Sequence, residues 1–381
     1  MTAGRLLWHN TSGTGSSRVS HFAYWNQEQS VTPSIEDVAK LAGVGKGTVS
    51  RVLNNRPGVS ERTAARVRHA IRELGYRPNV QAQRLARNVS NLICFVLSNR
   101  DFLHEFHSMV LKGVESYCSG SQRDVVFALW RYDLDAAPAD VIVPRIVSSR
   151  GSVDGVILAG ANRVECVKAI TSLGLPCVTF GNNLIGCKSL SEVDAVWYDE
   201  STGTQEAIRY LADLGHRHIR FVANIGIPWY ARNWRAFSDA MIDAGLAPIS
   251  TSVGDTEDNT EIAERAIEQI LTDKEPTTAL FAGNDGIAVA LIRGLMKRGI
   301  KTPRDMSVIG FDDVPSCLDI DPPLTTVRVP KEELGAECAR FLFEKISNPE
   351  SVTGARVIPT RLTIRNSCSA PGGVWPIKGQ A

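Results

Sequence analysis

The chain has 381 residues, of which 43% are apolar, and this is enough to build two or three domains with well-filled cores. No apolar run approaches the roughly 18 residues that a membrane-spanning helix needs, and the N-terminus lacks the pattern of a secretory signal. We therefore expect a cytoplasmic protein with no membrane partner. The eight cysteines are scattered without a C-x-x-C pair, so we expect reduced and mostly buried thiols, with neither a metal site nor a cofactor.

Residues 1–30 are rich in Ser, Thr, Gly and Asn, a composition for which we expect mostly disorder. The segment is either a genuine extension or the result of a start codon assigned too early, and both alternatives remain open. A regular apolar pattern begins only after it.

A short amphipathic helix is predicted to begin at Ile35. Ser34 can cap its first free backbone amides, and the carboxylate of Asp37 lies three residues later, as in a capping box. Apolar residues at positions 35, 38, 39 and 42 fall on one stripe, and Gly43 ends the helix.

The second predicted helix follows at once and has a polar outer face. Its buried face is expected to hold residues 44, 48, 49, 52 and 53, whereas the side pointing away from them carries Lys46, Gly47, Ser50 and Arg51. Two short helices joined by the tripeptide AGV are typical of a helix-turn-helix. Gly45 leaves the second helix without a side-chain cap.

This N-terminal head is strongly basic. A third helix, capped by Ser60 and ended by Gly75, can close a small core over the first two, and such a pattern alone could be an ordinary helical bundle. Residues 31–90, however, hold 11 Lys and Arg against 4 Asp and Glu, a net charge of +7, whereas the whole chain carries +1 and residues 91–381 carry −7. A basic head on an acidic body favours binding to a polyanion.

The segments DVAKLAGV, TVSRVLN and LGYRPN follow one another in the head, and in order and spacing they resemble the lactose-repressor (LacI/GalR) family of bacterial transcription regulators. The resemblance implies base contacts by Lys46, Gly47 and Arg51, although glycine has no side chain with which to read a base. Arg51 can bond a guanine edge in two places, which gives about 1–3 kcal/mol of discrimination. Positions that the resemblance places near phosphates are Ser34, Thr48, Ser50, Asn54, Ser60 and Thr63.

The segment NVQAQRLAR, residues 79–87, is too short for a stable isolated helix, because helices below about 12 residues are marginal in water. By resemblance it is a hinge helix that orders on DNA when two copies pair in the minor groove. The resemblance implies that Leu85 wedges between the central base pairs and that the groove is also contacted by Asn79, Ala82 and Gln83. Paired hinges imply a homodimer, with a tetramer left open, and a near-palindromic double-stranded operator. An ordinary amphipathic linker is the alternative.

From residue 91 apolar runs alternate with amphipathic stretches, which predicts parallel sheets covered by helices on both faces. The first set has the runs LICFVLS, VVFALW, VDGVILAG and PCVTFG, and a helix is expected from Val141. The second has IRFVAN, TALFAG and SVIGFDD, with helices expected at 202–214, 233–244, 260–271 and 285–298. A crossing strand in PPLTTVRVP and a helix at 331–346 follow.

These two sets resemble the two-lobed, periplasmic-binding-protein-like core of the same family. The predicted fold is an all-α helix-turn-helix head at 31–78, a hinge helix and linker at 79–90, and an α/β core of parallel sheets at 91–365 for effector binding and dimerisation. A C-terminal tail is predicted at 366–381.

In such open sheets a ligand binds in the cleft at the carboxyl ends of the strands. The candidates are therefore the residues that follow strands, namely Phe106, His107, Asn182, Asn284, Asp285 and Asp312. Three of these positions have a structural alternative. Asp285 can cap its helix, Asn182 can serve a turn, and one of Asp312 and Asp313 can be a structural carboxylate.

The segment PWYARNWRAFSDAM departs from the family pattern. Relatives usually carry Arg three residues before the small residue that precedes the aromatic, here Ala236 and Phe237, and that position holds Asn233. Arg232 lies one position earlier, so we select Arg232 together with Asn233 as candidates for ligand binding beside a helix N-terminus. The family implies that the effector is a sugar or sugar derivative.

The sequence contains none of the motifs G-x-S-x-G, G-x-x-x-x-G-K-[ST] and H-E-x-x-H, and no G-x-G-x-x-G after a strand. The close pair His216 and His218 fits a helix end better than a metal site. We therefore predict a sequence-specific DNA-binding transcriptional regulator, a repressor controlled by a small molecule between two lobes, and not an enzyme. The competing hypotheses are a solute-binding or sugar-modifying protein with the same core and a non-specific architectural DNA protein, which would bind any duplex with similar affinity.

Overall fold

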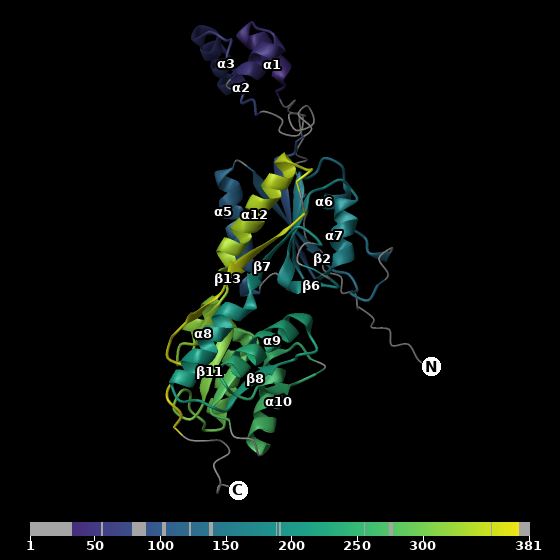
Figure 1. Cartoon of the computed structure of the whole chain (residues 1–381). Helices are drawn as coiled ribbons and strands as arrows, with labels where there is room; N and C mark the ends of the chain where they lie inside the picture. Colours follow the sequence, from purple (N-terminus) through teal and green to yellow (C-terminus); the bar gives the residue numbers. More distant parts are fainter. Residues whose placement is uncertain are drawn as a thin grey trace, which may run out of the picture. The chain divides into compact units, whose positions relative to one another are not determined.

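The computed structural model describes residues 33–54, 56–77, 89–100, 104–121, 123–136, 140–187, 189, 192–254, 256–273, 277–351 and 353–372. The chain divides between residues 83 and 84 into two compact units, a helical head and a larger α/β core (Figure 1). Residues 1–30 and the predicted hinge contacts Asn79, Ala82, Gln83 and Leu85 lie outside the described residues.

The head consists of three helices, α1 (Ile35–Ala42), α2 (Lys46–Leu53) and α3 (Glu61–Glu73). Ser34 and Asp37 form the reciprocal capping box at the start of α1, and Gly43 ends that helix in the left-handed conformation with φ of 60°. One valine from each helix is fully buried in the shared core: Val38, Val49 and Val67. The predicted helix-turn-helix is confirmed.

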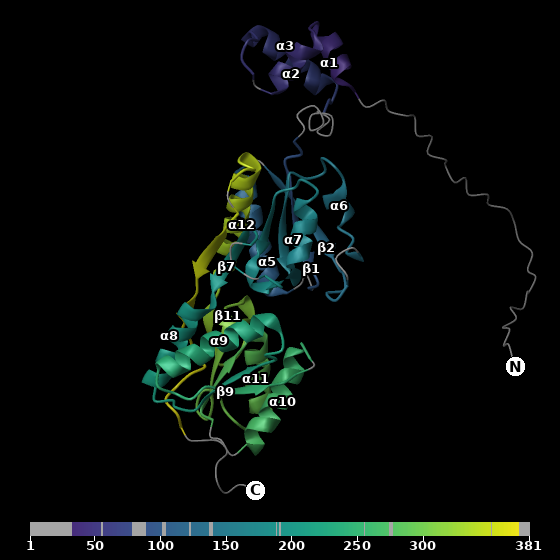
Figure 2. The ribbon, with the colours of Figure 1, turned by 45° about the vertical axis from the view of Figure 1, so that its right-hand side comes forward.

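The first lobe of the core is a parallel sheet of six strands in the order β13-β7-β5-β3-β1-β2. The strands are β1 (Leu92–Ser98), β2 (Asp124–Trp130), β3 (Gly155–Gly160), β5 (Cys177–Phe180), β7 (Ala195–Asp199) and β13 (Ala355–Pro359). Alternate residues of β1 face opposite sides, so Phe95 packs with helices α5 (Glu105–Gly120) and α12 (Lys331–Ser347), and Val96 packs with α7 (Val164–Thr171). Figures 1 and 2 show α5 and α12 together on one side of this sheet.

The second lobe has the strand order β14-β12-β11-β10-β8-β9 and is parallel except for its edge strand β14. Its strands are β8 (Ile219–Ala223), β9 (Ile249–Ser252), β10 (Ala279–Ala282), β11 (Ser307–Asp312), β12 (Thr325–Arg328) and β14 (Arg361–Thr363). The helices that cover it form two packed pairs, α8 (Glu200–Asp213) with α9 (Pro228–Asp243), and α10 (Asn259–Thr272) with α11 (Asp285–Lys297).

The chain passes between the lobes three times, from β7 to α8, from β12 to α12 and from β13 to β14. Two of these crossings are joined at Thr360, whose hydroxyl donates to the carbonyl oxygen of Asp199 at 2.6 Å and accepts from the amide of Gly203 at 3.0 Å. The two lobes therefore meet at a hydrogen-bonded hinge, and the carboxyl ends of the strands face the cleft beside it.

Three local expectations need correction. The helix expected from Val141 is a single turn, α6 (Arg145–Ser148), because Pro144 disfavours a helical conformation in the residue before it. Helix α9 begins at Pro228 and not at residue 233, since proline is preorganised for the first helical position. The predicted tail begins with packed residues, because Ser367 is fully buried and its hydroxyl accepts from the amide of Thr325 at 2.8 Å.

The remaining elements of the core are short: β4 (Asn162–Arg163), β6 (Leu184–Ile185) and the 3₁₀ turns η2 (Gly181–Asn183) and η3 (Pro315–Leu318). All eight cysteines are unpaired, and all except Cys187 and Cys368 are buried, as expected. Within the described ranges, no helix is both long and apolar enough to cross a membrane.

Candidate functional site

Helix α2 of the head presents the polar face that its sequence predicts. Its exposed side carries Lys46, Gly47, Ser50 and Arg51, whereas Val49 is completely buried on the opposite side. Gly45 at the N-cap makes no side-chain hydrogen bond, as expected. Lys46 forms an exposed ion pair with Glu36 of α1, and pairs of this kind contribute only about 0–1 kcal/mol. Lys46 can therefore exchange this carboxylate for a nucleic-acid group at low cost.

Two of the positions expected near phosphates are helix N-caps. Ser34 caps α1, and Ser60 caps α3 by accepting from the amide of Thr63. The hydroxyls of Ser60 and Thr63 lie 2.9 Å apart, and the side-chain amide of Asn54 donates to the carbonyl oxygen of Ser50 at 2.7 Å. A helix N-terminus concentrates free amides and partial positive charge, which suits an anionic phosphate.

Arg66 holds the head together in a way that no sequence motif predicts. From α3 its guanidinium donates to the carbonyl oxygen of Ala42 at 2.5 and 3.2 Å and to that of Gly43 at 3.1 Å. These carbonyls end α1 and have no partner within that helix. Arg66 therefore fixes α1 relative to α3 and so supports the position of α2 between them.

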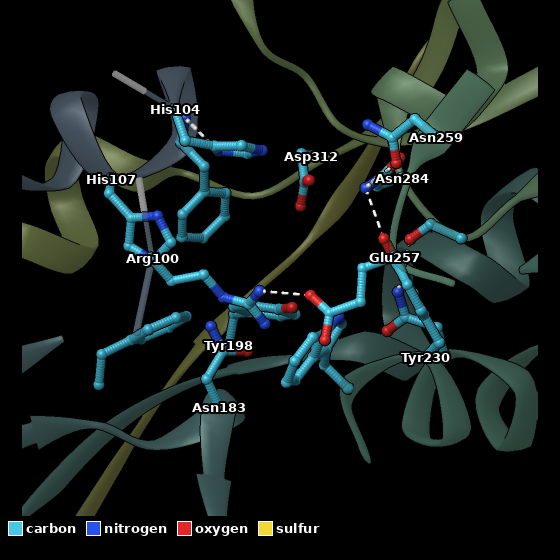
Figure 3. Close-up of a pocket in the computed structure, with 15 residues that line it drawn as sticks. Arg100, His104, His107, Asn183, Tyr198, Tyr230, Glu257, Asn259, Asn284 and Asp312 are labelled. Atoms are coloured by element: carbon cyan, nitrogen blue, oxygen red, sulfur yellow. Dashed lines mark hydrogen bonds and ion pairs between the residues drawn. The ribbon is translucent and has the colours of Figure 1, made fainter. Parts of the chain in front are cut away.

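In the core, a cavity of about 170 Å³ lies between the lobes, at the carboxyl ends of strands from both sheets (Figure 3). This is the volume of about six water molecules. The first lobe contributes Arg100, His104, Phe106, His107, Phe180, Asn183 and Tyr198, and the second contributes Trp229, Tyr230, Asn233, Glu257, Asn259, Gly283, Asn284 and Asp312.

Aromatic rings form much of the wall. The ring of Phe106 lies 5.6 Å from that of Phe180 and 6.5 Å from that of Tyr198, measured between centroids. On the other lobe, the ring of Trp229 carries the guanidinium of Arg100 at 4.0 Å from its centroid. Such walls suit the flat, apolar face of a small ring compound.

Two buried side chains in the wall have polar atoms without partners. His107 is 5% exposed, and neither ring nitrogen has a hydrogen-bond partner among the described residues. Burial, with help from the nearby charges of His104 and Arg100, lowers the pKa of His107 to about 3, so its imidazole is neutral. Asn233 is 4% exposed; its amide donates to the carbonyl oxygen of Gly283 at 3.0 Å, but its oxygen Oδ1 has no partner in the described part of the chain.

The charged side chains of the wall come from both lobes. Arg100 and Glu257 form an ion pair across the cleft at 2.8 Å (Figure 3). Asp312 ends β11 with φ of 119°, an uncommon conformation for a residue other than glycine. Burial and the neighbouring Asp285 raise the pKa of Asp312 well above its ordinary value, although Lys331 opposes this effect.

Five of the predicted ligand residues line this cavity, namely Phe106, His107, Asn233, Asn284 and Asp312. The other three, Asn182, Arg232 and Asp285, lie outside its lining. Asn182 is fully buried and bonds to the main chain of Tyr198 in both directions, while Arg232 pairs with Glu200 at 3.1 Å.

Asp285 also has structural partners. It accepts from the amide of Val314 at 2.9 Å and from the hydroxyl of Thr326 at 2.5 Å. It does not cap its helix; that role belongs to Asn284, whose oxygen accepts from the amide of Ile287 at 2.7 Å. The residues of the cavity wall that the sequence did not single out include Arg100, Tyr198 and Glu257. Arg100 follows β1, Tyr198 lies in β7 and Glu257 lies in the loop before α10, and none of these segments carries a recognisable motif.

His216 is part of the core and not of a metal site. One ring nitrogen bonds to the hydroxyl of Thr278 at 2.9 Å, and the other lies 3.0 Å from the hydroxyl of Ser307 and 2.9 Å from the carbonyl oxygen of Ser369. Among the residues that the structure describes, no group of three or more His, Cys, Asp or Glu side chains could hold a metal ion.

Comparisons with known proteins find a matching family model for the head and another for the core. A model of periplasmic binding protein-like domains matches residues 208–368, and a model of bacterial regulatory proteins of the lacI family matches residues 34–79. The HTH-type transcriptional regulator DegA of Bacillus subtilis (strain 168) is 31% identical over 341 residues, which are 88% of this chain and 98% of DegA.

Two solved structures are similar over most of the chain. A complex of the transcriptional regulator CelR with cellobiose is 28% identical with a TM-score of 0.63, and the alignment covers 88% of this chain and 99% of that one. The Lac repressor bound to ONPG in the repressed state is 25% identical with a TM-score of 0.74 and the same coverage. With its helix-turn-helix head and two-lobed core, the chain belongs to the lacI family of bacterial regulatory proteins and is a DNA-binding transcriptional regulator.

Proposed function

We propose that the protein is a homodimeric repressor that binds a near-palindromic double-stranded operator and responds to a small molecule, a sugar or sugar derivative, in the cavity between its lobes. The observation that carries this proposal is the exposed polar face of α2 on a head whose segment, residues 31–90, carries a net charge of +7. The similarity to a regulator solved with cellobiose and to a repressor supports the ligand class and the direction of control.

On the operator, Arg51 and Lys46 read base edges in the major groove, and Gly47 allows close approach of the backbone. Ser34, Thr48, Ser50, Asn54, Ser60 and Thr63 hold the phosphates. The hinge places Leu85 between the central base pairs, with Asn79, Ala82 and Gln83 in the minor groove. The protein acts in the cytoplasm, where it meets the chromosome, and catalyses no reaction.

The dimer has support in the core. Strand β2 is an edge strand of the first sheet, and it exposes Phe127 by 38% and Leu129 by 47%. An edge strand with exposed apolar side chains is a surface that a second copy can cover. A two-fold dimer brings two heads to two half-sites, which is why the operator should be nearly palindromic.

In the core, the proposed effector contacts are the five cavity residues Phe106, His107, Asn233, Asn284 and Asp312. Asn182, Arg232 and Asp285 act behind them: the first two join through Glu200, and Asp285 supports the loop at Val314. Ligand binding changes the angle between the lobes and thereby the spacing of the two hinges, which alters operator affinity by about 1–3 kcal/mol.

The experiment is selection of duplexes from a random pool by the purified full-length protein at moderate salt, with Arg51→Ala as the variant. We expect the wild type to select a single near-palindromic motif. The Arg51→Ala variant should lose the preference for guanine at the position that Arg51 contacts. Retention of duplexes without any motif would contradict sequence-specific binding. The matched control is Arg145→Ala, which removes an arginine from the core and should leave the motif unchanged.

A protein that only binds solutes is the competing function. A chain that lacks residues 1–88 should lose DNA binding but keep ligand binding, because the cavity lies entirely in the second unit. If the shortened chain bound duplex DNA as tightly as the full chain, the head would not be the DNA-binding module.

A further inference from the structure

Two acceptors of the cavity wall lack a hydrogen-bond donor among the described residues. The carboxylate of Asp312 points into the cavity and accepts no hydrogen bond from any described residue (Figure 3). Oδ1 of Asn233 is a second acceptor without a partner, and the neutral imidazole of His107 offers one acceptor and one donor. A ligand that satisfies these acceptors must therefore supply hydrogen-bond donors.

The arginine in the described wall of the cavity is already engaged. Arg100 is paired with Glu257 at 2.8 Å and stacked on Trp229, so its charge and its planar face are both in use. His107 is held neutral by burial. A phosphate or carboxylate group would meet the carboxylate of Asp312, and such a contact is unfavourable in a partly buried site.

The ammonium group of Lys331 lies near the buried carboxylate of Asp285 and the partly buried carboxylate of Asp312. Lys331 is 2% exposed, and its Nζ donates to the carbonyl oxygens of Asp312, Asp313 and Val329. Its positive charge lowers the pKa of both Asp285 and Asp312. The two arginines close by, Arg365 and Arg328, pair with Asp313, and Arg328 is about half exposed, so solvent screens its charge.

When Asp285, Asp312 and Asp313 are all ionised, the shielded cations are Lys331 and Arg365, so one negative charge is in excess if the half-exposed Arg328 is left out of the count. Burial raises the pKa of both Asp285 and Asp312, and the charge of Asp285 raises the pKa of Asp312 further. A cation beside Asp312 would balance this excess charge, and the aromatic rings of Phe106 and Tyr198 line the same cavity.

We propose that the cavity binds a small polyhydroxylated compound that carries a protonated amine, that is, an amino sugar or a similar amino polyol. The ammonium group pairs with the carboxylate of Asp312, and the hydroxyl groups bond to His107 and to Oδ1 of Asn233. This inference rests on the proposed function, because it assigns the chemical class of the effector that the interlobe cavity binds.

The test compares sugars that differ only in the amine. Titration calorimetry with the full-length protein at pH 7 would use three pairs: glucosamine with glucose, galactosamine with galactose, and mannosamine with mannose. We expect at least one amino sugar to bind, and to bind about tenfold more tightly than its neutral partner, because hydrogen bonds to a charged group are stronger than those between neutral groups. N-acetylation of that sugar, which removes the charge, should abolish the preference.

The variant Asp312→Asn keeps the shape of the side chain, and asparagine tolerates positive φ better than most residues. We expect it to bind the amino sugar and its neutral partner with equal affinity. Asp319→Asn removes an exposed carboxylate that is outside the cavity and should keep the wild-type ratio. Operator binding and the unfolding temperature of each variant show whether it is folded.

The outcomes separate this inference from the proposed function. If a neutral sugar binds as tightly as its amino partner and alters operator affinity, the protein is a sugar-responsive regulator and the amine inference is wrong. The inference is equally overturned if no amino sugar of the three pairs binds at millimolar concentration, or if Asp312→Asn keeps the wild-type preference. Failure of operator selection, in contrast, would count against the proposed function itself.

Discussion

At the scale of single residues, His107 is expected to favour ligand binding but to lower the stability of the ligand-free core. Its two ring nitrogens are buried without partners in the described structure, and an unsatisfied buried polar group costs about 1–3 kcal/mol. Replacing it by leucine should therefore raise the free energy of unfolding of the core by about 1–2 kcal/mol and weaken effector binding. Urea unfolding followed by circular dichroism measures the first effect.

The contrasting variant is His216→Leu, because His216 is equally buried but both of its nitrogens are bonded. This substitution leaves the hydroxyl groups of Thr278 and Ser307 short of a partner and should lower the free energy of unfolding by about 1–3 kcal/mol. A loss of stability in both variants would show that His107 is held by interactions that its geometry does not reveal.

Asp285 gives the core a specific dependence on pH. Burial raises its pKa from 3.8 to about 6, so between these values the folded state holds a proton that the unfolded chain releases. Asp285 should therefore lower the free energy of unfolding as the pH rises from about 4 to about 6, by on the order of 3 kcal/mol, and its contribution should stay level above that range. Asp285→Asn cannot ionise, so its unfolding curves at pH 4.5 and 7 should differ less than those of the wild type.

At the scale of secondary-structure elements, glycine permits the close packing of α5 against α12. A Cβ atom on Gly335 would clash with the carbonyl oxygen of Val110, and one on Gly113 would clash with that of Glu332. Gly335→Ala should lower the free energy of unfolding by about 1–3 kcal/mol, because both backbones must move apart. Gly354→Ala, where a Cβ meets no atom within 4 Å, should change it by less than about 0.5 kcal/mol in the same urea titration.

The elements also show what the sequence could predict. Helices with local start signals, such as α1 with Ser34 and α12 after a proline, lie within a residue of their expected bounds. Strands β13 and β14 are separated only by Thr360 but belong to different sheets, and no local pattern divides so short a stretch. Pairing between distant positions also limits what the sequence predicts about the site. Arg100 and Glu257 are 157 positions apart, so the sequence alone did not indicate that either residue lines the cavity.

At the scale of the whole core, two of the polar contacts between the described parts of the lobes lie away from the points where the chain crosses. One is the pair Arg100 and Glu257 in the cavity wall. The other lies outside the cavity lining, where the hydroxyl of Ser316 in η3 donates to Glu105 of α5 at 2.7 Å. Because the chain crosses between lobes only at the hinge, these contacts favour the closed arrangement over an open one.

Ser316→Ala tests this role without touching the cavity. A hydrogen bond to a carboxylate contributes about 1.5–3 kcal/mol, which is a factor of roughly ten or more in the ratio of closed to open molecules. Solution X-ray scattering of the ligand-free variant should therefore show a larger radius of gyration than the wild type. The matched control is Ser119→Ala, which removes a bond of the same length and chemistry to Glu115 within α5. Equal radii of gyration for both variants would mean that packing at the hinge alone sets the angle between the lobes. Effector binding would then change this angle by bending the chain segments that cross between the lobes, and not by exchanging contacts across the cleft.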